Sequence, residues 1–251
     1  IYCVGAYKGG NMMRKLLTLS ISTIAVLLVL GSARADEVFN SVTYYSKMSV
    51  SSGRYINLNY SPTGKTIVRA KYAASTTGNN CLYCARNGTS ASASEPVFCF
   101  FPSVDKKFRF DYYAKTYPGG VGSVANDVYE LEVKNGTATV TDVTKGTTDT
   151  ASRPEGLADF DAKYPLYLLA SYTSGATTPG GWGNYFQGDF YYLRIYEIED
   201  GVEVLKREYI PCKTADGKTG LAERVGESVY FEKNGNSFGV KDEDVIVFGP
   251  T

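Results

Sequence analysis

Histidine is absent from this 251-residue sequence, and its absence removes whole classes of chemistry. Neither a Ser-His-Asp or Cys-His nucleophile nor a histidine-bearing zinc site can be built without it. An excess of positive charge is also lacking, because 26 lysines and arginines balance 26 aspartates and glutamates. We therefore expect no nucleic-acid partner, since such binding needs a basic surface. Aromatic residues, in contrast, are abundant, with 21 tyrosines and 12 phenylalanines beside a single tryptophan.

Long apolar runs are lacking as well, apart from residues 16–30. That run follows Arg14 and Lys15 and precedes Ala33-Arg34-Ala35. A basic start, an apolar stretch short for a membrane span and small residues at a cleavage site are typical of a secretory signal peptide. We predict that residues 1–35 are upstream sequence plus signal peptide, and that residues 36–251 form one exported domain without a membrane span, at the cell surface or outside the cell. A single N-terminal membrane anchor is the alternative.

The rest of the chain alternates apolar and polar residues in short segments, which is typical of strands with one buried face. The segments cover residues 54–60, 66–72, 97–101, 107–113, 127–133, 137–143, 165–172, 190–198, 202–210, 230–232 and 245–248. Asn135-Gly136 and Asp200-Gly201 separate neighbouring segments and predict tight hairpin turns, because these residues tolerate positive φ. No long segment has helical periodicity. The sequence therefore predicts an all-β fold, a two-sheet antiparallel jelly-roll sandwich rather than an up-and-down barrel.

Three sequence blocks, each present once, carry a family resemblance through their order and spacing. They begin with Tyr55-Ile56-Asn57-Leu58-Asn59-Tyr60-Ser61-Pro62, with Phe190-Tyr191-Tyr192-Leu193-Arg194-Ile195-Tyr196-Glu197, and with Asp216-Gly217-Lys218-Thr219-Gly220-Leu221. Together they resemble the concanavalin A-like lectin/glucanase superfamily, and within it the laminin-G-like jelly-roll domains of exported bacterial proteins. Members often have Tyr-Asp after the third block, where this chain has Ala222-Glu223. The resemblance implies two sheets packed face to face, one of them concave. It does not imply one activity, because the superfamily contains lectins, glycoside hydrolases and adhesion modules.

Catalytic chemistry has little support in the sequence. A glycoside hydrolase needs two carboxylates that flank the sugar bond. Glu197 and Glu199 share a strand face, but they run into a turn and lack the carboxylate pattern of the laminarinase-like branch, so we interpret them as a solvated strand end. Asp159 and Asp161 alone do not supply the six or more oxygens that calcium needs. We predict a protein that is not an enzyme and has no cofactor or metal, with calcium binding left open.

Four cysteines follow residue 35, namely Cys81, Cys84, Cys99 and Cys212. Cys81 and Cys84, three residues apart in a strand, would point to opposite faces and would not bond to each other. The segments around Cys84 and Cys99 can pair as a hairpin across residues 87–95, which would place these two residues opposite each other. We predict a disulfide between Cys84 and Cys99, which export permits. Buried free thiols that act as small hydrophobic groups are the alternative.

The glycine-rich segment 174–188 holds the only tryptophan, and long loops of this kind are often functional. Flat aromatic faces suit the apolar faces of sugars, and amide groups can add directional hydrogen bonds. The predicted ligand-binding residues are Trp182, Asn184, Tyr185 and Gln187, with Tyr112 added because one of Tyr112 and Tyr113 should face outward and could line a concave face. The alternative for this pair is packing in the core. An alternative for Trp182 is that it plugs the edge of the sandwich.

The predicted function is non-catalytic recognition by a secreted module, with a glycan as the expected ligand and a cell-surface protein as the other partner considered. A structural or protein-adhesion module without a small ligand is the alternative, and a glycoside hydrolase ranks third.

Overall fold

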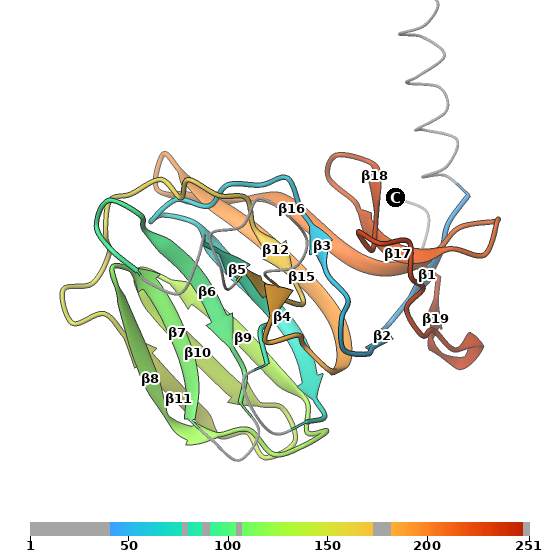
Figure 1. The fold of residues 1–251 in the computed structure, drawn as a ribbon, viewed down its shortest axis with the longest axis horizontal. Helices are drawn as coiled ribbons and strands as arrows, with labels where there is room; N and C mark the ends of the chain where they lie inside the picture. Colours follow the sequence, from blue (N-terminus) through green and yellow to red (C-terminus); the bar gives the residue numbers. More distant parts are fainter. Residues whose placement is uncertain (1–40, 77–79, 87–90, 104–106, 173–181, 248–251) are drawn as a thin grey trace, which may run out of the picture.

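The structure is a computed structural model that describes residues 41–76, 80–86, 91–103, 107–172 and 182–247. Two antiparallel sheets pack face to face (Figure 1). We call the eleven-stranded sheet the large sheet and the six-stranded sheet the small sheet. The described residues contain no α-helix, and the prediction of an all-β, two-sheet antiparallel sandwich is confirmed. No helix among these residues is long and apolar enough to cross a membrane.

The large sheet has the strand order β11-β10-β9-β4-β15-β16-β1-β19, with β2, β17 and β18 attached beside this path. Its strands are β1 (Thr43–Tyr45), β2 (Met48–Val50), β4 (Ile67–Ala74), β9 (Tyr129–Lys134), β10 (Thr137–Asp142), β11 (Thr148–Ser152), β15 (Gly188–Glu199), β16 (Val202–Lys213), β17 (Thr219–Glu223), β18 (Ser228–Phe231) and β19 (Val245–Ile246). A 3-10 turn, η2 (Asp242–Asp244), precedes β19.

The small sheet has the order β3-β12-β5-β6-β7-β8. Its strands are β3 (Ile56–Asn57), β5 (Tyr83–Ala85), β6 (Val97–Phe101), β7 (Lys107–Tyr113), β8 (Lys115–Gly122) and β12 (Tyr167–Leu168). A separate pair joins β13 (Ser171–Tyr172) to β14 (Trp182–Gly183).

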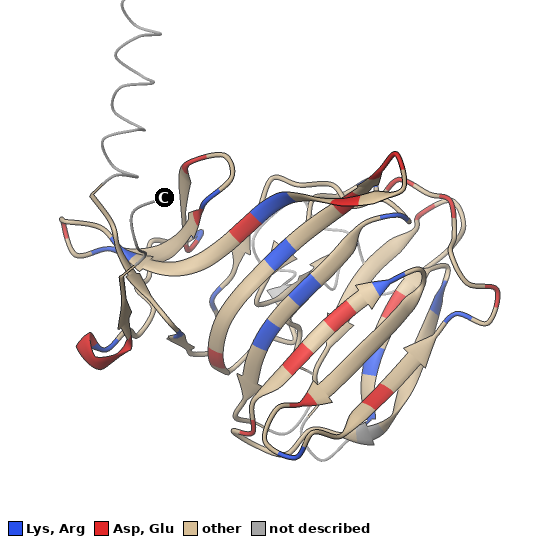
Figure 2. Cartoon of the chain, turned by 180° about the vertical axis from the view of Figure 1, so that it is seen from behind, with Lys and Arg blue, Asp and Glu red and all other residues tan. Residues whose placement is uncertain are grey.

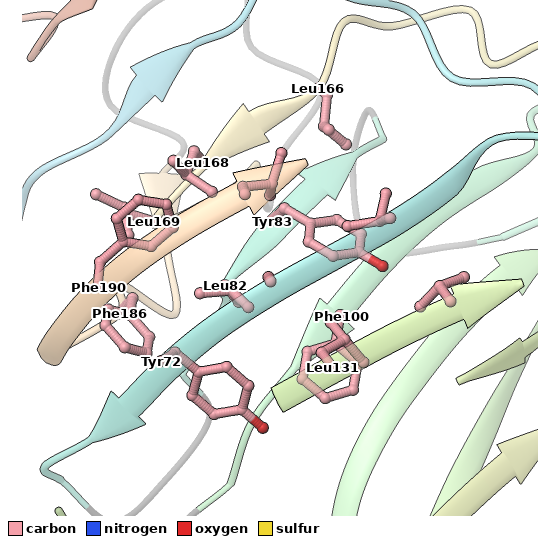
Figure 3. Packing of buried hydrophobic residues seen from close by; sticks show 14 of the residues in the cluster. Tyr72, Leu82, Tyr83, Phe100, Leu131, Leu166, Leu168, Leu169, Phe186 and Phe190 are labelled. Carbon is pink, nitrogen blue, oxygen red and sulfur yellow. The ribbon is translucent and has the colours of Figure 1, made fainter. Parts of the chain in front are cut away.

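Aromatic rings fill the space between the sheets (Figure 3). The Tyr83 and Phe98 rings stack with centroids 5.6 Å apart, and the Phe100 ring lies 6.1 Å from the ring of Tyr72 on the large sheet. All four side chains are fully buried. Burial of one such side chain contributes about 1.5–3 kcal/mol, so these four rings contribute substantially to the stability of the fold.

Two hairpin turns agree with the sequence prediction. In the β9–β10 turn Asn135 and Gly136 have φ of 51° and 72°, and in the β15–β16 turn Asp200 and Gly201 have φ of 51° and 80°. Positive φ at both central residues matches the twist of the flanking strands. The turns therefore set the register of both hairpins.

Other segments differ from the prediction. Residues 54–60 contain only the two-residue strand β3, and residues 165–172 divide into β12 and β13 around Leu169, whose φ is 72°. Strands β1, β2, β8, β11 and β17 were not predicted. Strand β8 contains Pro118 and three glycines, which propensity disfavours, but Pro is tolerated here because β8 is the edge of the small sheet.

The outer face of the large sheet carries rows of paired charges (Figure 2). Arg69 on β4 contacts Glu132 at 2.7 Å and Glu203 at 2.8 Å, and its guanidinium lies 4.7 Å from the centre of the Tyr196 ring. Arg194 likewise contacts Glu208 at 2.7 Å. The partly exposed pairs of Arg69 each contribute at most about 1 kcal/mol, so they favour strand register more than stability. Glu208, in contrast, is buried and is paired with both Arg194 and Arg224.

Strand β16 extends beyond the sandwich. Its first half pairs with β15, and its second half pairs with β17 and β1 (Figure 1). We call β1, β17, β18 and β19 the side extension.

Candidate functional site

The predicted binding loop lies largely outside the described residues, which omit 173–181. The backbone of Trp182 belongs to β14 and is paired with Tyr172 of β13. The Trp182 side chain falls outside what the structure describes. The role of this side chain therefore stays a prediction.

The segment that follows β14 is held in place by its polar groups. Asn184 has a φ of 50°, its Nδ2 donates to the Ser171 hydroxyl at 2.9 Å, and its carbonyl accepts the Cys81 N–H at 2.7 Å. The Gln187 carbonyl accepts the Ser75 N–H at 2.9 Å. Asn184 thus anchors the turn, and the half-buried side chains of Asn184 and Gln187 both stay binding candidates.

Tyr185 is half-buried beside Cys81, with which it forms a parallel β-bridge. Burial raises the pKa of its hydroxyl, and the nearby Glu232 carboxylate raises this pKa further. The hydroxyl is therefore a neutral donor over the physiological pH range. Tyr185 stays a binding candidate as well.

Tyr112 is not on a surface, and the expectation that it lines a concave face needs correction. Its side chain is 1% exposed and faces the core. Its hydroxyl donates to the Gly64 carbonyl at 2.8 Å and accepts the Ala158 N–H at 3.2 Å. The alternation of β7 turns Tyr112 inward and leaves its neighbour Tyr113, with a φ of 57°, half-exposed. Tyr112 is a core residue.

Four chain segments lie together at one end of the sandwich. Backbone hydrogen bonds link residue 143 to residue 128, residue 126 to residue 74, and residue 75 to residue 187. We call this end, formed by residues 74–76, 123–128, 142–148 and 184–189, the loop end; it is the lower end of β4 in Figure 1. The predicted binding segment is therefore tied to the same end as the β10–β11 turn.

A cavity of about 150 Å³ opens at the loop end. Phe108, Tyr129 and Val140 form its apolar wall. Its polar lining residues are Ser123, Asp142, Lys145, Thr147, Thr148 and Asp149. A second cavity, of about 240 Å³, lies beside it between β2, the end of β4 and Asn126. An apolar wall with a few convergent polar groups is the usual composition of a small-ligand site.

Fixed charges surround the first cavity. The Asp142 carboxylate accepts the N–H groups of Thr144 and Lys145, both at 2.9 Å. The Lys145 ammonium contacts Asp142 at 3.0 Å and Asp127 at 2.6 Å. These hydrogen bonds, led by the one from the Lys145 N–H, lower the pKa of Asp142. Asp142 is therefore a permanent hydrogen-bond acceptor and cannot act as a general acid at neutral pH.

The carboxylates considered for hydrolysis lie elsewhere. Glu197 accepts hydrogen bonds from the Tyr60 hydroxyl and from the Thr66 hydroxyl, and Glu199 is paired with Lys206. Asp161 forms a β-bridge with Thr63. Across the described ranges no group of three or more cysteine, aspartate or glutamate side chains is placed to hold a metal ion.

The outer face of the small sheet holds a second, smaller cluster of buried side chains, formed by Cys81, Cys84, Val97, Cys99 and Phe101. Cys84 on β5 lies directly opposite Cys99 on β6, as the predicted hairpin requires, and their Sγ atoms are 2.7 Å apart as free thiols. Burial raises the pKa of both thiols well above the ordinary value. At neutral pH these thiols are almost entirely protonated and are therefore poor nucleophiles, so we interpret the cluster as structural. The disulfide itself stays a prediction.

Sequence reasoning missed the cavity residues Asp142, Lys145 and Asp149. One local signal was present, because Asp142 precedes a Lys145-Gly146 turn, whereas residues 148–152 show no apolar and polar alternation. The Asp149 carboxylate packs against Gly120, where an added Cβ would lie 2.8 Å from it and would make this side chain shift.

Comparison with known proteins gives distant structural likeness. No family model and no curated protein matches the sequence. A "putative carbohydrate binding protein from Bacteroides ovatus" aligns over 81% of this chain at 11% identity and a TM-score of 0.49, and the chain spans 62% of that structure's length. Scytalido-glutamic peptidase aligns over 75% of this chain and 98% of its own at 10% identity and a TM-score of 0.35. SCP-B, of the eqolisin family of peptidases, aligns over 64% of this chain and 82% of its own at 12% identity and a TM-score of 0.29. At these values the likeness carries no information about activity.

Proposed function

We propose that this chain is an exported, non-catalytic recognition module of the concanavalin A-like, laminin-G-like type, and that it binds a glycan at the loop end. The cavity beside the β10–β11 turn is the observation that carries the proposal. Its lining hydroxyls and carboxylates suit sugar hydroxyls, and the nearly buried Phe108 and Tyr129 form an apolar floor beneath them. The signal-like residues 12–35 support export.

The charges at the cavity favour binding over catalysis. A glycosidase needs one carboxylic acid that is protonated at working pH. Asp142 is held ionised by backbone N–H groups and by Lys145, so it can accept hydrogen bonds but cannot donate a proton. Trp182, Tyr185 and Gln187, on the segment tied to the same end, are proposed to extend the binding surface beyond the cavity.

The test is a broad glycan-array screen of the purified protein, with and without calcium, followed by titration of each glycan that binds. Two variants accompany the wild type, Thr147→Val at the cavity and Trp182→Ala on the loop. Thr147→Val keeps the side-chain shape and removes one hydroxyl, so we expect about tenfold weaker binding. Trp182→Ala should weaken binding by a similar or larger factor.

Controls separate binding from folding. Val202→Thr, at an exposed position of β16 that lines none of the three cavities, should leave glycan affinity unchanged. Binding that survives both Thr147→Val and Trp182→Ala would place the site elsewhere. No binding to any glycan by folded protein would favour the structural or protein-adhesion module, and turnover of a glycan would revive the hydrolase.

A further inference from the structure

A third hollow lies between β2 and residues 237–239, and it shares Ser49 and Val50 with the second cavity but no residue with the loop-end cavity. It is an open groove of about 430 Å³, lined by Ser49, Val50, Ser51, Arg54, Ser237, Phe238 and Gly239. Two backbone hydrogen bonds close its base, because Ser49 and Gly239 each donate to the other's carbonyl, at 2.7 and 3.0 Å. The groove is therefore built on paired backbone, and it is shallow and open to solvent on its outer side.

Arg54 is the only charged residue among those lining the groove. Its guanidinium donates to the Ser237 carbonyl and lies 5.9 Å from the centre of the Phe238 ring. Within the described part of the chain no carboxylate lies within ion-pair distance of Arg54, whereas the neighbouring cation Lys47 is paired with Asp189 at 3.0 Å. A half-buried arginine that keeps unused N–H donors beside a hollow is an anion-binding feature.

The other lining groups narrow the class of anion. Ser51 and Ser237 are exposed and place hydroxyls on the two sides of the groove, while Val50 and Phe238 form a nearly buried apolar floor. One guanidinium balances the single charge of a carboxylate and matches its two oxygens, but it leaves a phosphate, with a charge near −2, undercompensated. Hydroxyls on both sides and an apolar floor are the partners that a sugar ring requires.

We propose that this groove binds an acidic sugar, with Arg54 holding the sugar carboxylate and Ser51 and Ser237 bonding the ring hydroxyls. The site is separate from the loop-end cavity. This proposal rests on the proposed function in one respect only, namely the expectation that the ligand is a sugar.

The experiment is a titration of the isotope-labelled protein followed by NMR, with glucuronate, glucose and acetate as separate probes. Glucuronate should shift the backbone amide signals of Ser51 and Gly239, and should bind at least about tenfold more tightly than either glucose or acetate. Raising the salt concentration should weaken glucuronate binding, because the contact is charged and partly exposed. Equal affinity for glucuronate and glucose would overturn the role of the carboxylate, and equal affinity for glucuronate and acetate would overturn the role of the sugar.

Three variants make the result specific. Arg54→Gln should reduce glucuronate affinity about tenfold or more, and Ser51→Ala, at an exposed position that is safe for folding, should reduce it several-fold. Thr147→Val, at the loop-end cavity, should not change it. If Thr147→Val abolishes glucuronate binding while Arg54→Gln does not, acidic sugars bind at the loop end and the groove proposal is wrong. If glucuronate binds here while no glycan responds to Thr147→Val, the groove proposal stands and the loop-end proposal falls.

Discussion

Cys84 and Cys99 face each other across two strands, and their Sγ atoms are in contact. If the protein folds in an oxidising compartment, we expect them to form a disulfide and Cys81 and Cys212 to stay free. The bond would close a loop of 15 residues and stabilise the fold by about 3 kcal/mol. Because burial raises the pKa of both thiols, the bond should form during folding and exchange slowly afterwards.

Thiol counting in denaturant measures this prediction. Oxidised protein should keep Cys84 and Cys99 unreactive until a reductant is added, and mass spectrometry should find the two in one linked peptide. Cys84→Ser should cost stability under oxidising conditions, and far less under reducing ones. Reactive Cys84 and Cys99 in protein secreted from cells would show that the pair remains as buried thiols.

A second prediction concerns the contribution of the Asp142 carboxylate to stability and its dependence on pH. Its pKa is lowered in the folded protein by the Lys145 and Thr144 N–H groups and by the Lys145 ammonium. A group whose folded pKa is lowered stabilises the fold above its unfolded pKa of about 3.9, and this contribution disappears as the pH falls through the folded value. We expect Asp142→Asn to cost about 1–2 kcal/mol at pH 7 and much less in strong acid.

Urea unfolding of wild type and Asp142→Asn at neutral pH and near pH 2 checks this expectation. The gap between the two unfolding free energies should narrow below about pH 4. A gap that is the same at both pH values would mean that the carboxylate charge does not stabilise the turn.

The turns of the β9–β10 and β10–β11 hairpins differ in how much space their glycines have. Gly136 and Gly146 both have positive φ, 72° and 68°, so alanine is strained at either position. A Cβ on Gly136 would lie 2.5 Å from the Gly156 carbonyl oxygen, whereas a Cβ on Gly146 would meet nothing within 4 Å. We expect Gly146→Ala to cost about 1–2 kcal/mol, and Gly136→Ala to cost about 1–3 kcal/mol more.

Chemical unfolding of the two variants measures the difference directly. Gly146→Ala serves as the matched control, because it carries the backbone strain without the collision. Equal losses of stability would mean that residue 156 moves aside and that only backbone strain matters.

Elements that depend on local chemistry were predictable from the sequence. The Asn135-Gly136 and Asp200-Gly201 turns need positive φ, and the residues that tolerate it mark them. Strand β8 was not predictable, because Pro118 and its glycines obscure the pattern, and what makes it a strand is pairing with β7 along an edge. Gly119 is required there because the Phe108 ring occupies the space of a side chain.

The candidate site was harder to predict than the strands. Asn184, Tyr185 and Gln187 follow one another in the chain, so one loop brings them together without any knowledge of the fold. The cavity joins Phe108 on β7, Tyr129 on β9 and Asp149 on β11, and these residues meet only once both sheets are assembled. Tyr112 was misjudged although the pattern could place it, since period-two alternation puts it on the same face as Phe108 and Phe110, which are buried.

At the scale of the whole molecule, β16 joins the sandwich to the side extension. Leu193 on β15 pairs with Tyr209 on β16, which in turn pairs with Glu223 on β17. Tyr209 and Leu221 are both fully buried in the same core, and Tyr209 packs edge-on against Tyr230 of β18 at 5.6 Å. Because one continuous strand and one core serve both parts, we expect them to unfold as a single cooperative unit.

Native-state hydrogen exchange can test this cooperativity. The amides of Leu221 and Ala222 in β17 should open with the same free energy, and the same denaturant dependence, as those of Val68 in β4 and Leu193 in β15. Replacing Leu221 with alanine should cost about 2–5 kcal/mol and lower protection equally in both parts, since the cavity it leaves lies in their shared core. Protection lost only in β17 and β18 would instead make the side extension an independently unfolding segment, and the sandwich alone would then be the unit that carries the binding sites.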